Sequence, residues 1–396
     1  MAIADVKEYT HLTTEEVEEL GREFDAIRAE VEESRGDKDA AYIYRMIKIQ
    51  RRLATAGRVM LFASSLPPAW VAGAAMLGVA KILENMEIGH NIMHGQWDWM
   101  NDPEVHSSTW EWDTAQPAEQ WKHSHNYIHH QFTNVLGYDN DIGYGILRVA
   151  REQKWHPVYL GQPVFNVLLA TLFQWGVALH DLDIEAIRKR EKDPKVMKKQ
   201  LRQIGRKIRR QIGKDYVLFP LLSGPQFVST VTANATANLM RNLWSYMIIF
   251  CGHFPDGAMH FTEQEIEDET RAEWYLRQML GSANFEGGPL LHVMSGNLGF
   301  QIEHHLFPDL PSNRYSEISV KVRALCEKYG IPYTTGPLLK QYGQVLRTIT
   351  KLALPNKMTK SDRPEPPAPI DRRRRSEADR PIRRLETGNF TAHATA

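Results

Sequence analysis

The chain has 396 residues, and its 48 Lys and Arg balance its 48 Asp and Glu. This length accommodates one large domain or two ordinary ones, and the balanced charge provides no overall field that would favour nucleic acid as a partner. The cysteines, Cys251 and Cys326, form no CxxC pair, so they predict neither a disulfide framework nor a cysteine-based metal site.

Residues 1–40 form a polar segment with a helical pattern. Leu20, Phe24, Ile27 and Val31 recur at spacings of three and four, which predicts an amphipathic helix. Either Thr13 or the residue after it can serve as its N-cap. The segment lacks a basic region followed by an apolar one, so we expect no signal peptide.

The main domain, residues 41–355, contains three apolar stretches at 57–83, 158–179 and 216–252. A membrane-spanning helix needs about 20 mostly apolar residues, and each stretch is interrupted by Gly, Pro, Asn or Arg. Two interpretations are open. The stretches are buried helices of a large soluble α-domain, or they are membrane helices, in which Pro and Gly are tolerated. We favour the interpretation that these stretches are membrane helices.

A block rich in Lys and Arg, residues 187–214, separates the second and third apolar stretches. The positive-inside rule places such a loop in the cytoplasm. A nucleic-acid surface would carry interleaved aromatic side chains for stacking, and this block has none. A solvated surface, or one facing lipid headgroups, is the better interpretation.

Three separate histidine clusters carry most of the functional information. Imidazole is a strong ligand for iron, copper, zinc and nickel. Pairs at i and i+4 lie on one face of a helix, whereas adjacent histidines point about 100° apart, which suits two metals side by side. The clusters therefore predict more than one metal ion and redox chemistry. Their members are His90, His94, His125, His129, His130, His304 and His305.

Weaker candidates surround these clusters. His253 ends the third apolar stretch and is as readily interfacial as a ligand, while His123 and His292 are less favoured. The remaining histidines, His180 among them, have no partner pattern. Four carboxylates are candidates to orient the imidazoles: Glu87, Asp139, Asp141 and Glu303.

Asn234, Asn238 and Asn242 recur at i+4 within the third apolar stretch. Polar groups at membrane depth usually face the interior of a bundle or a cavity. The stripe therefore either lines a substrate tunnel or forms hydrogen bonds between helices.

The order HxxxH, HxxxHH and QxxHH followed by LFPxLP resembles the integral-membrane fatty acid desaturases. The similarity runs from about residue 40 to 355. Stretches such as CGHFPDG, YLRQMLGSANF and LPSNRYSEIS are similar to the actinobacterial acyl-CoA desaturases, which are associated with Δ9 desaturation of stearoyl-type chains.

This resemblance implies an all-α protein in the cell membrane, a multi-pass bundle of about four spans. A cytosolic helical cap would hold a non-haem di-iron centre facing the cytoplasm. Gln301 stands where many relatives have histidine and is a further possible ligand. The resemblance leaves open whether His123 or His125 binds metal. The ligands it implies are His90, His94, His125, His129, His130, His253, His304 and His305.

The reaction implied is O₂-dependent desaturation of a long-chain acyl-CoA such as stearoyl-CoA, giving a cis double bond at Δ9. Two Fe²⁺ ions and two electrons from NAD(P)H would be required. The chain has no cytochrome b5-type segment, no four-cysteine iron–sulfur pattern and no GxGxxG after a strand. We therefore expect a separate reductase or ferredoxin as electron donor.

Two alternatives have different consequences. A membrane hydroxylase uses the same histidine boxes but leaves a hydroxyl group on the product. A non-catalytic metal transporter would place histidines or acids within the spans, whereas these clusters flank the apolar stretches. Residues 356–396 are rich in Pro and Arg, which predicts a disordered tail.

Overall fold

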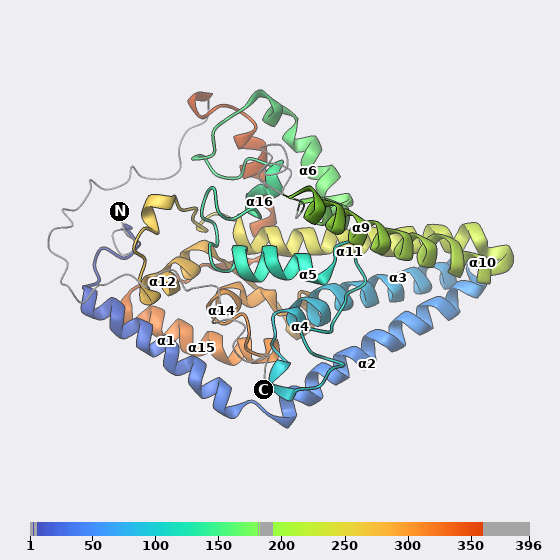
Figure 1. Ribbon diagram of the computed structural model, residues 1–396, viewed down its shortest axis with the longest axis horizontal. Coiled ribbons are helices and arrows are strands. Elements are labelled where there is room, and N and C mark those ends of the chain that lie inside the picture. The colour runs from blue at the N-terminus through green and yellow to red at the C-terminus, as the bar shows by residue number, and fades with distance from the viewer. Residues whose placement is uncertain (1–2, 4–5, 181, 183–192, 359–396) are drawn as a thin grey trace.

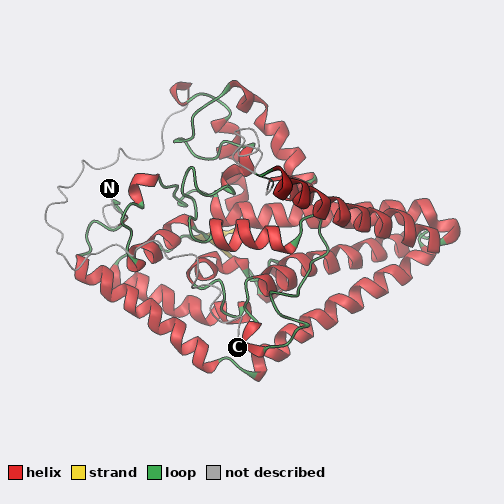
Figure 2. Cartoon of the chain, viewed as in Figure 1, coloured by secondary structure: helices red, strands yellow, loops and turns green. Residues whose placement is uncertain are grey.

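The computed structural model describes residue 3 and residues 6–180, 182 and 193–358 (Figure 1). This part is mostly helical, with long loops between the helices and little strand (Figure 2), which confirms the all-α expectation. The sheet recorded in it joins two short parallel strands, β1 (Asn284–Glu286) and β2 (Thr335–Pro337). Residues 183–192, which include the start of the basic block, and the tail from residue 359 onward lie outside the described residues.

The N-terminal segment forms α1 (Thr14–Ser34), as its apolar spacing predicts. Thr13 is the N-cap: its hydroxyl accepts from the Glu16 amide at 3.2 Å, and the Glu16 carboxylate accepts from the Thr13 amide at 2.8 Å. This reciprocal pair is a capping box. The apolar face of α1 is buried against α12 (Arg271–Gly281) and α15 (Tyr315–Tyr329).

A long helical hairpin follows, made of α2 (Asp37–Met60) and α3 (Pro67–Leu83). The boundary proposed at residue 40 falls within α2. The two helices approach closely because glycines face the partner: a Cβ on Gly57 of α2 would lie 2.9 Å from a side-chain carbon of Leu77 on α3. Helix α11 (Phe227–His253) packs along α3, and in Figure 1 these helices extend together away from the cap.

The chain enters α11 through nearly continuous helix: α9 (Pro194–Ile212), η8 (Gly213–Leu218), α10 (Phe219–Leu222) and η9 (Gly224–Gln226). A bent unit of η7 (Pro157–Gly161), α6 (Gln162–Thr171) and α7 (Phe173–His180) packs on α11, and α6 also contacts α16 (Leu338–Leu352). Among the described residues, no single helix has both the length and the apolar character to cross a bilayer. The bent unit, whose halves meet at 101°, passes that test on length and composition alone.

The cap is built around an apolar core between α1, α12, α15 and α14 (Gln301–Leu306). Short elements connect it to the hairpin and to α11. Those that precede the second apolar stretch are η2 (Leu61–Ala63), η3 (Glu84–His90), α4 (Asn91–Met93), η4 (Asp98–Met100), α5 (Ala118–Trp121), η5 (Lys122–His129) and η6 (Ile142–Gly145). Those that follow it are η10 (Glu263–Glu265), α13 (Pro289–Met294), η11 (Leu298–Phe300), η12 (Ser312–Arg314) and η13 (Asn356–Met358).

Candidate metal centre

The first histidine cluster lies where α3 passes into η3, a wide π-helical turn. Such turns interrupt α-helices mostly at functional sites. His90 ends η3 and His94 follows α4, so that their Nε2 atoms lie 3.3 Å apart. Both side chains are buried, and the two nitrogens point into the same space.

The second cluster lies on η5, which is also π-helical. The amide of His130 donates to the carbonyl of His125 at 3.0 Å, an i to i+5 hydrogen bond. The three rings lie near one another: the His130 centroid lies 4.9 Å from that of His125 and 5.4 Å from that of His129. The rings of His125 and His129 stack with centroids 4.9 Å apart.

The third cluster, His304 and His305, lies on α14 in the cap, and His253 is the last residue of α11. All three side chains are buried. The centre is therefore assembled from the ends of two long helices, one wide turn and one short cap helix, which are far apart in the sequence.

The imidazoles form two groups. One ring nitrogen from each member of a group lies within 4.8 Å of the others. The ring of His130 lies between the groups, with its centroid 4.4 Å from that of His305 and 4.6 Å from that of His94. The first group is His90, His94, His125 and His304, and the second is His129, His253 and His305.

Several ring nitrogens in these groups have no hydrogen-bond partner among the described residues although they are buried. They are Nε2 of His125, His304 and His305, Nδ1 of His253, and both nitrogens of His130. Buried polar atoms in folded proteins are almost always paired. Neutral imidazole nitrogens converging at two places are the donor set of a nitrogen-ligated transition metal, so these residues fit two metal ions.

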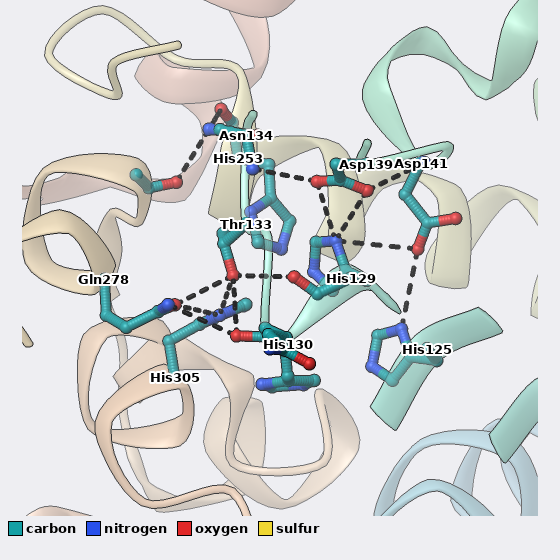
Figure 3. Close-up of polar contacts among 12 residues, drawn as sticks. His125, His129, His130, Thr133, Asn134, Asp139, Asp141, His253, Gln278 and His305 are labelled. Atoms are coloured by element: carbon teal, nitrogen blue, oxygen red, sulfur yellow. Dashed lines mark hydrogen bonds and ion pairs between the residues drawn. The ribbon is translucent and has the colours of Figure 1, made fainter. Parts of the chain in front are cut away.

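Side chains that do not belong to either histidine group orient the rings through hydrogen bonds and ion pairs (Figure 3). His129 Nδ1 lies 3.0 Å from Asp139 Oδ2, and His125 Nδ1 lies 3.5 Å from Asp141 Oδ2. His305 Nδ1 lies 3.1 Å from the side-chain oxygen of Gln278. Such contacts fix the tautomer and direction of a ligating histidine.

Burial and mutual repulsion keep most of these rings neutral. Burial lowers the pKa of His90 to about 3. Burial, reinforced by neighbouring imidazoles, lowers the pKa of His94 and His130 well below the ordinary value. Burial also opposes the charged form of His129, but Asp139 outweighs it and raises the pKa of this ring. A neutral imidazole is the form that binds metal.

Comparison with known proteins agrees with this centre. Residues 65–337 match the model of the fatty acid desaturase family. The NADPH-dependent stearoyl-CoA 9-desaturase of Mycobacterium tuberculosis is 55% identical over 371 residues, which cover 93% of this chain and 87% of that protein. This chain belongs to the fatty acid desaturase family. The sn-1 linoleoyl-lipid 6-desaturase of Synechocystis is 24% identical over 330 residues, covering 81% of this chain and 90% of that protein.

The desaturase brings together the seven histidines of the three boxes and adds His253. Gln301 lies beside them, with its Nε2 3.0 Å from His253 Nε2. His123 and His292 lie outside both groups: His123 stacks on Tyr127, and the ring of His292 stacks on Phe300 with centroids 4.4 Å apart.

Sequence spacing predicted the partners of these rings only in part. Asp139 and Asp141 contact imidazoles, but Glu87 and Glu303 instead accept hydrogen bonds from tyrosine and from asparagine amides. Spacing missed His180, whose Nε2 lies 3.5 Å from Asp141 Oδ1. It also missed Gln278 and Tyr315, which no pattern in the sequence singles out. The hydroxyl of Tyr315 lies 3.2 Å from His304 Nδ1.

The asparagine stripe divides between the two roles considered for it. The amide of Asn234 donates to the Asp215 backbone carbonyl at 2.6 Å, and that of Asn238 donates to the Asp215 carboxylate at 3.3 Å. This buried carboxylate also pairs with Lys81 at 2.7 Å. Asn234 and Asn238 therefore connect helices. Asn242 takes both roles: its amide donates to the Thr171 carbonyl of α6 at 2.8 Å, and it also lines the cavity that reaches the two histidine groups.

That cavity follows one face of α11. Asn242, Ser245, Ile249 and His253 line it at successive turns, so it extends along roughly 16 Å of helix. Phe173 and Val177 of α7 provide apolar walls, and Trp112 and Gln174, which contact α9, also line the cavity. His90, His125 and His129 also line it, so an alkyl chain in this cavity would pass directly beside both histidine groups.

Proposed function

We propose that this desaturase introduces a cis double bond at the Δ9 position of a long-chain acyl-CoA such as stearoyl-CoA. The observation that carries the proposal is a cavity that meets two convergent groups of buried, unpartnered imidazoles. The substrate and position follow the name of the Mycobacterium tuberculosis relative, because 55% identity extends over nearly the whole chain.

We propose that the two groups hold one iron ion each. His90, His94, His125 and His304 would bind the first, and His129, His253 and His305 the second, with His130 between them. Gln301 is placed to complete the second group through its buried side-chain oxygen. Two ferrous ions, when bound, supply the O₂-dependent oxidation that removes two hydrogens from adjacent methylenes and forms water.

The chain itself contributes orientation and exclusion of water. The apolar walls of the cavity would hold the alkyl chain extended along α11, and burial of the histidines keeps bulk water from the reacting carbons. The contacts of Asp139, Gln278 and Tyr315 hold the ligating rings in place.

Electrons would come from NAD(P)H through a separate reductase or ferredoxin. The sequence carries no nucleotide-binding or iron–sulfur pattern of its own. The NADPH dependence named for the Mycobacterium tuberculosis relative favours this nucleotide.

We place the end of the helical hairpin farthest from the cap and the start of α11 in the cell membrane, with the metal centre on the cytoplasmic side. Large apolar side chains are exposed at the end of the hairpin farthest from the cap, among them Val59, Phe62, Leu66 and Val71. Leu221, Leu222 and Val228 continue this surface across α10 and the start of α11. Contiguous exposed apolar surface of this kind marks contact with a membrane or a partner, and the positive-inside rule orients the basic α9 to the cytoplasm.

A product assay tests the proposal. Membranes containing wild-type protein or His94→Ala receive stearoyl-CoA, O₂, NADPH and a host reductase fraction, and double bonds are located by mass spectrometry. We expect an O₂-dependent Δ9 monoene from the wild type only. A hydroxy acid would instead establish the hydroxylase alternative. Conversion of a lipid-linked chain but not of stearoyl-CoA would move the substrate toward that of the Synechocystis relative.

A further inference from the structure

Helix α9 carries two sets of cations with different surroundings. Lys199, Lys207 and Lys214 face the loop at residues 111–119 and pair with Glu119, Glu111 and Asp113. The Lys207 ammonium lies 2.6 Å from the Glu111 carboxylate. These pairs neutralise the acidic groups of the loop and attach α9 to it.

The second set is exposed to solvent. Apart from the adjacent Arg209 and Arg210, its members recur every three or four residues, so they share one face of the helix. All of them are exposed, and within the described parts of the chain none has an acidic partner. They are Lys195, Lys198, Arg202, Arg206, Arg209 and Arg210. We call this surface the α9 basic face.

The helix that carries this face forms the outer support of the cavity wall. Lys207 donates to the Trp112 carbonyl, and Gln211 donates to the Gln174 side-chain oxygen at 2.9 Å. Trp112 and Gln174 both line the cavity. Nearer the start of α9, Gln203 contacts Gln120, whose carbonyl accepts from the hydroxyl of Ser124, another lining residue.

We propose that the α9 basic face binds the phosphates of the CoA part of the substrate. The inference rests on the proposed function, because it assumes that the acyl chain of an acyl-CoA occupies the cavity. CoA carries a pyrophosphate and a 3′-phosphate, and it must remain outside while its acyl chain passes the histidines. Arg and Lys are the side chains that recognise phosphates, and this unpaired set adjoins the wall of the cavity.

The direction of α9 favours CoA over lipid headgroups as the source of these phosphates. In Figure 1, the axis of α9 is roughly aligned with those of α3 and α11, and the chain continues through η8 into α10, near the end at which α11 begins. Near its end, Asp215 pairs with Lys81 on the last turn of α3. Only the cations near the C-terminus of α9 therefore approach the proposed membrane surface. Lys195, near the N-terminus, and Arg202, near the middle, lie farther from that surface on the cytoplasmic side.

The test uses the full chain in phosphatidylcholine nanodiscs. Arg202→Glu/Arg206→Glu reverses the centre of the face. Arg45→Glu/Lys48→Glu is the matched control, because these cations are also exposed and near one another on a helix but lie on α2. The probes are CoA and dephospho-CoA, which lacks the 3′-phosphate, followed by kinetics with stearoyl-CoA.

We expect the KM for stearoyl-CoA to rise about tenfold in the α9 variant, with kcat within about twofold of wild type. CoA binding should weaken similarly, and the preference for CoA over dephospho-CoA should shrink. The control should match wild type on all three readouts. Arg202→Gln/Arg206→Gln, which removes charge without reversing it, replaces the first variant if that one fails to fold.

Several outcomes would overturn the inference. Unchanged CoA binding and an unchanged KM in the α9 variant would do so directly. A KM effect that appears only when phosphatidylglycerol is added to the discs would assign the face to lipid. A rise confined to the KM for the electron donor would assign it to an acidic redox partner. A wild type that binds CoA but desaturates no acyl-CoA would contradict the proposed function and leave CoA binding intact.

Discussion

Replacement of Asp139 by asparagine tests how the centre holds His129. The two Asp139 oxygens lie 3.0 and 3.1 Å from His129 Nδ1, and they also accept from the amides of Asn134 at 2.8 Å and Asp141 at 2.9 Å. Each oxygen therefore accepts from one backbone amide as well as from the ring. An asparagine side chain in this place would offer one oxygen and one NH₂ group, and the NH₂ group would face a backbone donor.

Two effects follow from this geometry. One buried backbone N–H loses its acceptor, which costs about 1–3 kcal/mol of folding free energy. The loss of a charged partner to a ligating imidazole should also weaken iron binding by about 10- to 100-fold. The first effect lowers the denaturation midpoint, and the second lowers the chelator concentration that removes iron.

The assay is chelator competition followed by chemical denaturation, on wild type, Asp139→Asn and Asp25→Asn. Asp25 is the matched control, because its carboxylate is in an exposed ion pair with Arg271 and lies on α1, far from the histidine boxes in sequence. Exposed pairs contribute about 0–1 kcal/mol to the free energy of unfolding, so this control should unfold much as wild type does. Because Asp25 is far from the histidine boxes in sequence, its replacement should leave iron binding unchanged. Iron held as tightly by Asp139→Asn as by wild type would refute the role given to this carboxylate.

Further predictions concern other residues of the site and its surroundings. His94→Ala should lose about one of the two irons and its activity, whereas His123→Ala, outside both groups, should keep both irons and its activity; iron analysis and the product assay check this. Asn234→Leu leaves a buried carbonyl unpaired and should lower the unfolding free energy by about 1–3 kcal/mol, while Asn242→Leu should change chain-length preference, measured with acyl-CoAs of different length. Burial raises the pKa of Glu87 to about 8 from an ordinary 4.5. The folded state thus binds this proton more tightly, so stability should fall as pH rises between those values, and Glu87→Gln should flatten that part of the measured pH profile.

Local sequence rules were sufficient for α1 and for the start of α3. The apolar spacing of α1 and the Thr13–Glu16 capping box depend only on neighbours in the chain, and Pro67 begins α3 as its fixed backbone angle favours. The histidine boxes were equally visible, because several imidazoles gathered at such spacings beside apolar stretches are typical of metal binding.

Contacts between distant segments could not be predicted in the same way. Gln278 reaches His305 and Tyr315 reaches His304 only because the cap folds back over η3 and η5. The π-helical turn of η5 was not predicted either, and the His130 ring lies between the two histidine groups. Asn234 and Asn238 looked like candidates for a tunnel, but their partner, Asp215, lies on η8.

The central claim, that the imidazoles form two separate metal sites, is tested most directly by counting iron per chain. Purified wild type, His94→Ala and His305→Ala would be loaded with ferrous iron under anaerobic conditions, desalted and analysed for metal and protein. The account predicts two irons in the wild type and the loss of about one from each variant, since each substitution removes a ligand from a different group. One iron in the wild type, or loss of all iron from both variants together, would contradict two separate groups.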